Sequence, residues 1–246
     1  MINFFRKIRQ QLLDENRFKK YLIYAIGEIV LVVLGILIAL QINNWNQNRL
    51  NAIHETKILK HLKKELARNN ELNQALVINR LDKKIESLKS AKKFCENNMI
   101  IQDTLAFLNT VSYGGVFSGG HTFGERNSYD ELINTGNIQL INNDSIKNSI
   151  ANYYGYLKAV KERAKVHSSH FSNYTSELRP FNTENPNYIS KFDQVEMLES
   201  FNSPEFRKLV DLELSYTYKV RDYIKNVRTQ GNQTIKLIDK KLNNEL

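Results

Sequence analysis

Cysteine is almost absent from this chain of 246 residues, which has only Cys95. One cysteine cannot form a disulfide within the chain, so cysteine usage does not identify the redox compartment. A lone thiol is more often buried than reactive, and we expect Cys95 to be buried. An intermolecular bridge through Cys95 is the less favoured alternative.

The residue spacings typical of common catalytic and metal-binding motifs are also missing. The sequence has no G-x-S-x-G, H-E-x-x-H or C-x-x-C pattern, which excludes the common nucleophile elbow, zinc protease and thiol redox motifs. His167 and His170 are three residues apart and His54 and His61 are seven apart, but two ligands do not make a metal site. We therefore expect a protein that is not an enzyme, with no catalytic residue, no cofactor and no metal.

Glycine is scarce, and five of the ten glycines lie between Gly114 and Gly124, in the stretch SYGGVFSGGHTFGER. The stretch lacks the G-K-[ST] of a phosphate loop, and no predicted strand precedes it. A plain connector is favoured over a ligand-binding loop. Should the protein bind a ligand, the candidate residues are in and beside this stretch: Gly114, Gly115, Gly119, Gly120, His121, Phe123, Arg126 and Tyr129.

One long apolar run stands out against this background. Residues 21–42 read YLIYAIGEIVLVVLGILIALQI, long enough to span a bilayer, which needs about 20 apolar residues. The run is too long for the core of a signal peptide, no small-x-small cleavage site follows it, and a charged leader precedes it. We therefore predict a single transmembrane helix that stays attached.

Glu28 is the one ionisable side chain in that run, and at mid-membrane a carboxylate costs roughly 2.5–3.5 kcal/mol. Gly27, Leu31, Gly35 and Ala39 share one helix face, where small residues let another helix approach, and Tyr24 lies one turn before Glu28. Three interpretations stay open. Glu28 reaches the membrane surface or is protonated, it hydrogen-bonds within a helix–helix interface, or it belongs to a proton or ion path.

The net charge of +9 is uneven along the chain. Residues 1–20 have six basic and two acidic residues, residues 49–98 have twelve and six, and residues 99–246 have 17 of each. This distribution favours anionic lipid as the partner over nucleic acid.

The same charges predict the topology. Six basic residues precede the span and three follow it in residues 43–62, which places the N-terminus in the cytoplasm. We expect a cytoplasmic amphipathic leader at residues 1–20 and an extracytoplasmic helical domain at residues 43–246. In a Gram-negative cell the anchor would lie in the inner (plasma) membrane and the domain in the periplasm.

The remaining sequence indicates an all-α fold, a transmembrane helix followed by an antiparallel helical bundle. No proline or glycine occurs between residues 46 and 95, which predicts one long helix or two with a break near residues 69–73. Shorter helices are expected at 104–111 and 128–134, the second capped by Ser128. Asn143 or Asp144 should open a helix to about Arg179, and Ser203-Pro204 should begin the last one, with a possible kink at Gly231.

Two segments resemble a known family. The run KYLIYAIGEIVLVVLGILIALQINNWN, preceded by FFRKIRQQLL, is similar to the N-terminal signature of domain of unknown function 6090, seen in Bacteroidota. The segment SYDELINTGNIQLINNDSIKNSIANYY resembles that family's second signature. The resemblance implies a membrane-anchored helical protein and supports treating Glu28 as a family feature. It implies no activity.

Together these features favour a non-enzymatic interaction or sensor-like module that assembles as a homo-oligomer or with a membrane-protein partner. The alternative is an accessory subunit of a proton- or ion-coupled membrane complex that uses Glu28. A third hypothesis is a receptor for a soluble ligand at the glycine-rich stretch.

Overall fold

The computed structural model describes residues 18–97, 99–115 and 123–244, which form helices joined by short loops, with no strand among them. The chain divides into two units, one ending at Glu55 and the other beginning at Thr56. The all-α prediction is therefore confirmed for the described residues. The predicted amphipathic leader lies almost entirely outside them.

The first unit contains the apolar run, which lies in α2 (Phe18–Leu72). One 18-residue window of it is apolar enough to cross a membrane, and none of that window is buried. A row of large apolar side chains exposed in this way has no counterpart in a water-soluble helix, whose apolar stripe faces a core. The helix is therefore a candidate membrane span.

In the second unit the helical path is continuous to Cys95, so the first of the two predicted alternatives, one long helix, is confirmed. The end of α2 passes into a π-helix, η1 (Asn73–Ile78), and then into α3 (Asn79–Cys95). No proline or glycine interrupts this path. The irregularity expected near residues 69–73 is thus a change of helix type, beginning at Asn73, in place of a turn.

The middle of the chain has shorter helices. They are α4 (Thr104–Gly115), α5 (Asn127–Asn134), the 3-10 helix η3 (Asn137–Leu140), α6 (Asp144–Val166) and α7 (His170–Leu178). The Asn143 side chain caps α6, as predicted, by accepting from the Ile146 N–H. The single helix expected to reach Arg179 is wrong, because Ser169 caps a separate α7.

Two further helices complete the unit. The sequence analysis missed α8 (Lys191–Phe201), whereas α9 (Pro204–Leu242) begins as predicted, with Ser203 accepting from the Phe206 N–H. Gly231 does not interrupt α9.

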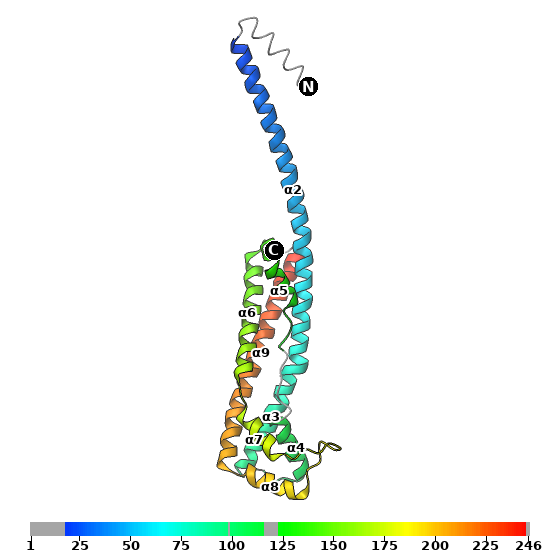
Figure 1. The fold of residues 1–246 in the computed structure, drawn as a ribbon, viewed down its shortest axis with the longest axis vertical. Coiled ribbons are helices and arrows are strands. Elements are labelled where there is room, and N and C mark those ends of the chain that lie inside the picture. Colours follow the sequence, from blue (N-terminus) through cyan, green and yellow to red (C-terminus); the bar gives the residue numbers. More distant parts are fainter. Residues whose placement is uncertain (1–17, 98, 116–122, 245–246) are drawn as a thin grey trace. The chain divides into compact units, whose positions relative to one another are not determined.

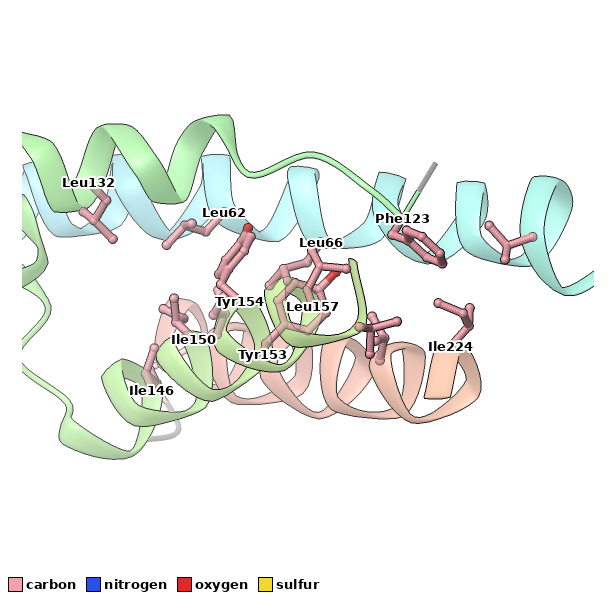
Figure 2. Close-up of a cluster of buried hydrophobic side chains, with 14 of the residues drawn as sticks. Leu62, Leu66, Phe123, Leu132, Ile146, Ile150, Tyr153, Tyr154, Leu157 and Ile224 are labelled. Atoms are coloured by element: carbon pink, nitrogen blue, oxygen red, sulfur yellow. The ribbon is translucent and has the colours of Figure 1, made fainter. Parts of the chain in front are cut away.

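The helices of the second unit pack around two clusters of buried apolar side chains. The larger cluster lies between α2, α6 and α9 (Figure 2), where Leu66, Tyr154 and Ile224 are fully buried. The smaller cluster joins α4, α7 and α8 to the end of α3 and the start of α9, and these segments lie together at one end of this unit (Figure 1). Polar contacts join α9 to the continuous path of α2, η1 and α3. They pair Lys63 with Asp239, Asn70 with Asn232, Asp82 with Arg221 and Lys92 with Asp211.

Candidate functional site

The small-residue face of the candidate membrane span is not covered by the residues that the structure describes. A Cβ added at Gly27 or Gly35 would meet nothing within 4 Å, Ala39 is exposed, and Tyr24 is 49% exposed. Glu28 lies on the same helix and is partly buried. Among the described residues, nothing therefore occupies the space beside the two glycines.

The glycine-rich stretch is described only at its two ends. Gly114 and Gly115 close α4, whereas Gly119, Gly120 and His121 lie outside the described residues. At the other end Phe123 is buried in the larger apolar cluster, and Gly124 has a positive φ of 97°. The described end of the stretch is therefore packed into the helical core.

Asn69 of α2 holds that end in place. Its amide donates to the Glu125 carbonyl at 2.8 Å and its Oδ1 accepts from the Glu125 N–H at 2.8 Å. Lys161 of α6 adds a hydrogen bond to the Gly124 carbonyl at 2.7 Å. A Cβ on Gly124 would lie 2.8 Å from the Asn69 side chain, so a glycine is required at this contact.

Glu65, one turn before Asn69, is a buried carboxylate that joins three helices. It accepts from the Ser128 N–H at 2.7 Å and from the Tyr154 hydroxyl at 2.5 Å. The prediction that Ser128 caps α5 is wrong, because Arg126 is the capping residue and makes no side-chain cap bond. A negative charge near a helix N-terminus is stabilising, so Glu65 supplies in part what a local cap would.

Arg126 and Tyr129, two of the ligand candidates, are engaged by neighbouring side chains. Arg126 donates to Asp130 Oδ1 at 2.9 Å, and its guanidinium carbon lies 5.5 Å from the ring centroid of Tyr129. Tyr129 in turn stacks on Tyr154 with ring centroids 4.3 Å apart. Tyr129 therefore packs α5 against α6, whereas Arg126 pairs with side chains of α5 itself.

The two buried tyrosines of α6 make stability sensitive to alkaline pH. Burial raises the pKa of the Tyr153 hydroxyl to about 12, and burial together with the Glu65 carboxylate raises the pKa of Tyr154. Both side chains are neutral in the folded and unfolded states below about pH 10, so their contribution is fully present there. Above pH 10 the unfolded chain loses these protons first, and stability falls.

We therefore expect the free energy of unfolding to fall between pH 10 and about 12, by up to ~1.4 kcal/mol per pH unit for each tyrosine. Denaturant unfolding of wild type and Tyr153→Phe at pH 9 and pH 11 measures this. The wild type should lose more stability than the variant. Equal losses would show that Tyr153 ionises alike in both states.

A buried ion pair forms a second polar centre, between α3 and α9. Lys84 and Glu213 are 5% and 2% exposed, and Lys84 Nζ donates to Glu213 Oε1. The other oxygen of Glu213 accepts from Ser169 Oγ at 2.8 Å and lies 3.7 Å from His167 Nε2. The Glu213 carboxylate thereby fixes the junction between α6 and α7.

The structure separates the paired histidines considered as metal ligands. His167 lies in the break after α6 and stacks on Tyr216 with ring centroids 3.3 Å apart, whereas His170 is the first residue of α7. Among the described residues, no group of three or more potential ligands could hold a metal ion.

An open groove of about 510 Å³ runs between α2, η1 and α9. Its side chains pair with one another, since Asn70 donates to Asn232 at 2.9 Å and Arg228 donates to Gln74. A Cβ at Gly231 would lie 2.7 Å from Asn70 Oδ1, so Gly231 allows a close helix contact. The side chains that line the groove thus hold these helices together.

Cys95 is partly buried, less than the sequence analysis expected. Its Sγ donates to the Phe201 carbonyl at 3.3 Å, and burial raises the pKa of the thiol. A thiol with a raised pKa is a poorer nucleophile at neutral pH.

The sequence analysis did not identify the polar residues that organise this core. Glu65, Asn69 and Asn73 are four residues apart on one helix face and all are buried. The sequence does contain a signal for them, because these polar residues occupy positions where the helical period predicts apolar side chains. Such a row indicates interior polar contacts.

Comparison with known proteins gives one family. The model described as "Family of unknown function (DUF6090)" matches residues 28–196, a range that begins within the apolar run and includes the second signature segment. No curated protein matches this chain. No solved structure matches it either.

Proposed function

Because the chain belongs to the DUF6090 family of unknown function, we propose its role from its structure: a membrane-anchored, non-enzymatic interaction or sensor-like module. The observation that carries the proposal is the apolar window of α2, which is long enough to span a bilayer and has none of its side chains buried. In water those side chains would expose a large apolar surface, which is unfavourable in free energy. Burial in a lipid bilayer removes this unfavourable exposure.

The anchor is proposed to hold the N-terminus in the cytoplasm and residues 43–246 in the periplasm. The six basic residues before the span and three after it support this orientation. The lipid bilayer is then the first partner, and anionic head groups account for the basic flanks without a nucleic acid.

The external part is proposed to be an antiparallel helical bundle. Polar contacts support this arrangement, since Lys63 of α2 pairs with Asp239, near the end of α9, and Lys92 of α3 pairs with Asp211, near its start. The residue numbers of the partners thus run in opposite directions along the two segments. Such a bundle, held together by buried polar pairs, is a stable scaffold for surfaces that bind a partner.

Assembly is proposed to occur through the face formed by Gly27, Gly35 and Ala39. Both glycines are free of neighbours in the single chain, and small residues four apart let two helices pack closely in a membrane. Glu28 and Tyr24 beside this face would hydrogen-bond within the interface.

We expect Gly35→Leu to lower in-membrane crosslinking of the full-length chain several-fold, because a large side chain holds the helices apart. Val33→Leu, which adds bulk on the other side of the helix, is the matched control and should crosslink like wild type. Glu28→Leu should also lower the yield. A wild type that gives no crosslinked product, or a Gly35→Leu variant equal to wild type, would refute this assembly.

The alternative role is an accessory subunit of a proton- or ion-coupled complex. It is favoured by Glu28, the one ionisable side chain in the apolar run. In that case Glu28→Gln would leave crosslinking at the wild-type level and still fail to complement a deletion strain. Complementation by Glu28→Gln would exclude this role.

A further inference from the structure

The outward side of α8 has apolar and acidic side chains on one helix face. Phe192 and Val195 are 78% and 57% exposed, and Glu196 and Glu199 are exposed beside them. Their spacing of i, i+3, i+4 and i+7 places all four on one face. The other side of α8 is already used, because Met197 and Phe201 are buried in the smaller apolar cluster.

The loop before α8 adds two exposed aromatic rings and is firmly held. Phe181 is 73% exposed and Tyr188 is 49% exposed. Beneath them the buried Arg179 donates to Asn109 Oδ1 at 2.7 Å and to the Pro186 carbonyl at 2.8 Å. Aromatic side chains held out on a fixed backbone are typical of protein contact surfaces, because little entropy is lost when they bind.

The charge of this segment is opposite to that of the whole protein. Residues 177–205 have six acidic and two basic residues, a net charge of −4, whereas the chain has +9. One of the two bases is Arg179, which is 3% exposed, so Lys191 is the basic side chain left at the surface. Two exposed carboxylates, Glu196 and Glu199, thus share the helix face of Phe192 and Val195.

We infer that this α8 surface, formed by Phe192, Val195, Glu196 and Glu199 and preceded by the aromatic loop, docks a cationic, apolar segment of a different protein. The apolar side chains supply the buried contact, and the carboxylates select basic residues and reject acidic ones. The inference deepens the proposed interaction module and uses a surface separate from the membrane face.

Charge argues against the other occupants. In a two-fold dimer the same patch meets itself, which would gather four carboxylates, Glu196 and Glu199 from each copy, in one interface. An anionic lipid surface would likewise repel these carboxylates. A basic partner segment is the occupant that satisfies both the apolar and the acidic side chains.

The test places the photoreactive phenylalanine analogue p-benzoylphenylalanine at position 192 of the full-length chain in native membranes. The crosslinked peptide should come from another protein and have several basic residues interleaved with apolar ones. Glu196→Lys with Glu199→Lys should lower the yield of this product about tenfold, because the attraction becomes repulsion. Glu86→Lys with Glu131→Lys, two exposed glutamates on other helices, should leave the yield unchanged.

Crosslinking to a second copy, to lipid or to an acidic segment would overturn the inference, as would no product or a yield insensitive to the α8 charge change. Circular dichroism of each variant confirms that the helices are intact. The outcome is independent of the membrane-helix experiment, since Gly35→Leu can lose its crosslink while position 192 keeps its own, and the reverse.

Discussion

Replacing Glu213 by leucine is expected to lower the free energy of unfolding by about 3–5 kcal/mol, the usual result of removing one partner from a buried ion pair. Lys84 is 5% exposed and would be left buried without its partner. Ser169 Oγ would lose its acceptor as well. Denaturant unfolding of the full-length chain in detergent, followed by helical circular dichroism, measures the change.

A second ion pair between the same two helices provides the control. Lys92 and Asp211 are 2.6 Å apart with side chains 38% and 46% exposed, so Asp211→Leu should cost less than about 1 kcal/mol. Lys84→Met combined with Glu213→Leu should recover most of the lost stability, since apolar replacement of both partners is often tolerated. A loss for Glu213→Leu no greater than for Asp211→Leu would contradict the buried pair.

Gly124→Ala is expected to destabilise the protein by about 2–4 kcal/mol, combining backbone strain with overpacking. The φ of 97° is unfavourable for alanine, and the new Cβ would lie 2.8 Å from the Asn69 side chain. Asn69 cannot turn aside cheaply, because both ends of its amide are bonded to the Glu125 backbone. Thermal and denaturant unfolding report the loss.

Gly136→Ala separates the two causes. Gly136 also has a positive φ, 71°, but nothing lies within 4 Å of a Cβ there, so its variant should show strain alone, about 1 kcal/mol. The Gly124→Ala effect should also shrink in an Asn69→Ala background, because the clash is removed. Equal effects at Gly124 and Gly136 would show that contact with Asn69 contributes nothing.

Features encoded by neighbouring residues were predictable from the sequence. Asn143 and Ser203 cap helices with their own side chains, and Gly136 adopts the left-handed conformation after α5. The apolar stripe of α9 is buried at Phe206, Val210, Val220, Ile224 and Val227, as its spacing indicated. Each of these depends on contacts within a few residues or on helical period alone.

Some local signals were present and were missed. Ser190 and Asp193 form a reciprocal pair at the start of α8, with the Asp193 N–H donating to Ser190 Oγ and that hydroxyl donating to Asp193 Oδ2. This S-x-x-D spacing is a capping box. Ser169, which caps α7, is likewise a local signal that the helix beginning at Asp144 ends before Arg179.

The pairing of polar residues in the core could not be predicted, because the partners are far apart in sequence. Glu65 meets Tyr154 across 89 positions, and Lys84 meets Glu213 across 129. Nothing in the residues around Ser128 shows that a glutamate from another helix approaches its N–H. For the same reason the sequence analysis proposed Arg126 and Tyr129 as ligand residues, although Arg126 pairs with Asp130 and Tyr129 stacks on Tyr154.

The π-helix at Asn73–Ile78 keeps the helices before and after it in register with the interior. Leu66 and Ile85 are nineteen positions apart and both are buried, yet five α-helical turns of 3.6 residues take only eighteen. The wider turn absorbs the extra residue, so both leucine-rich stretches keep the same side toward the interior. Deleting one residue within this segment should therefore be tolerated more readily than a one-residue deletion in the regular α-helix on either side of it.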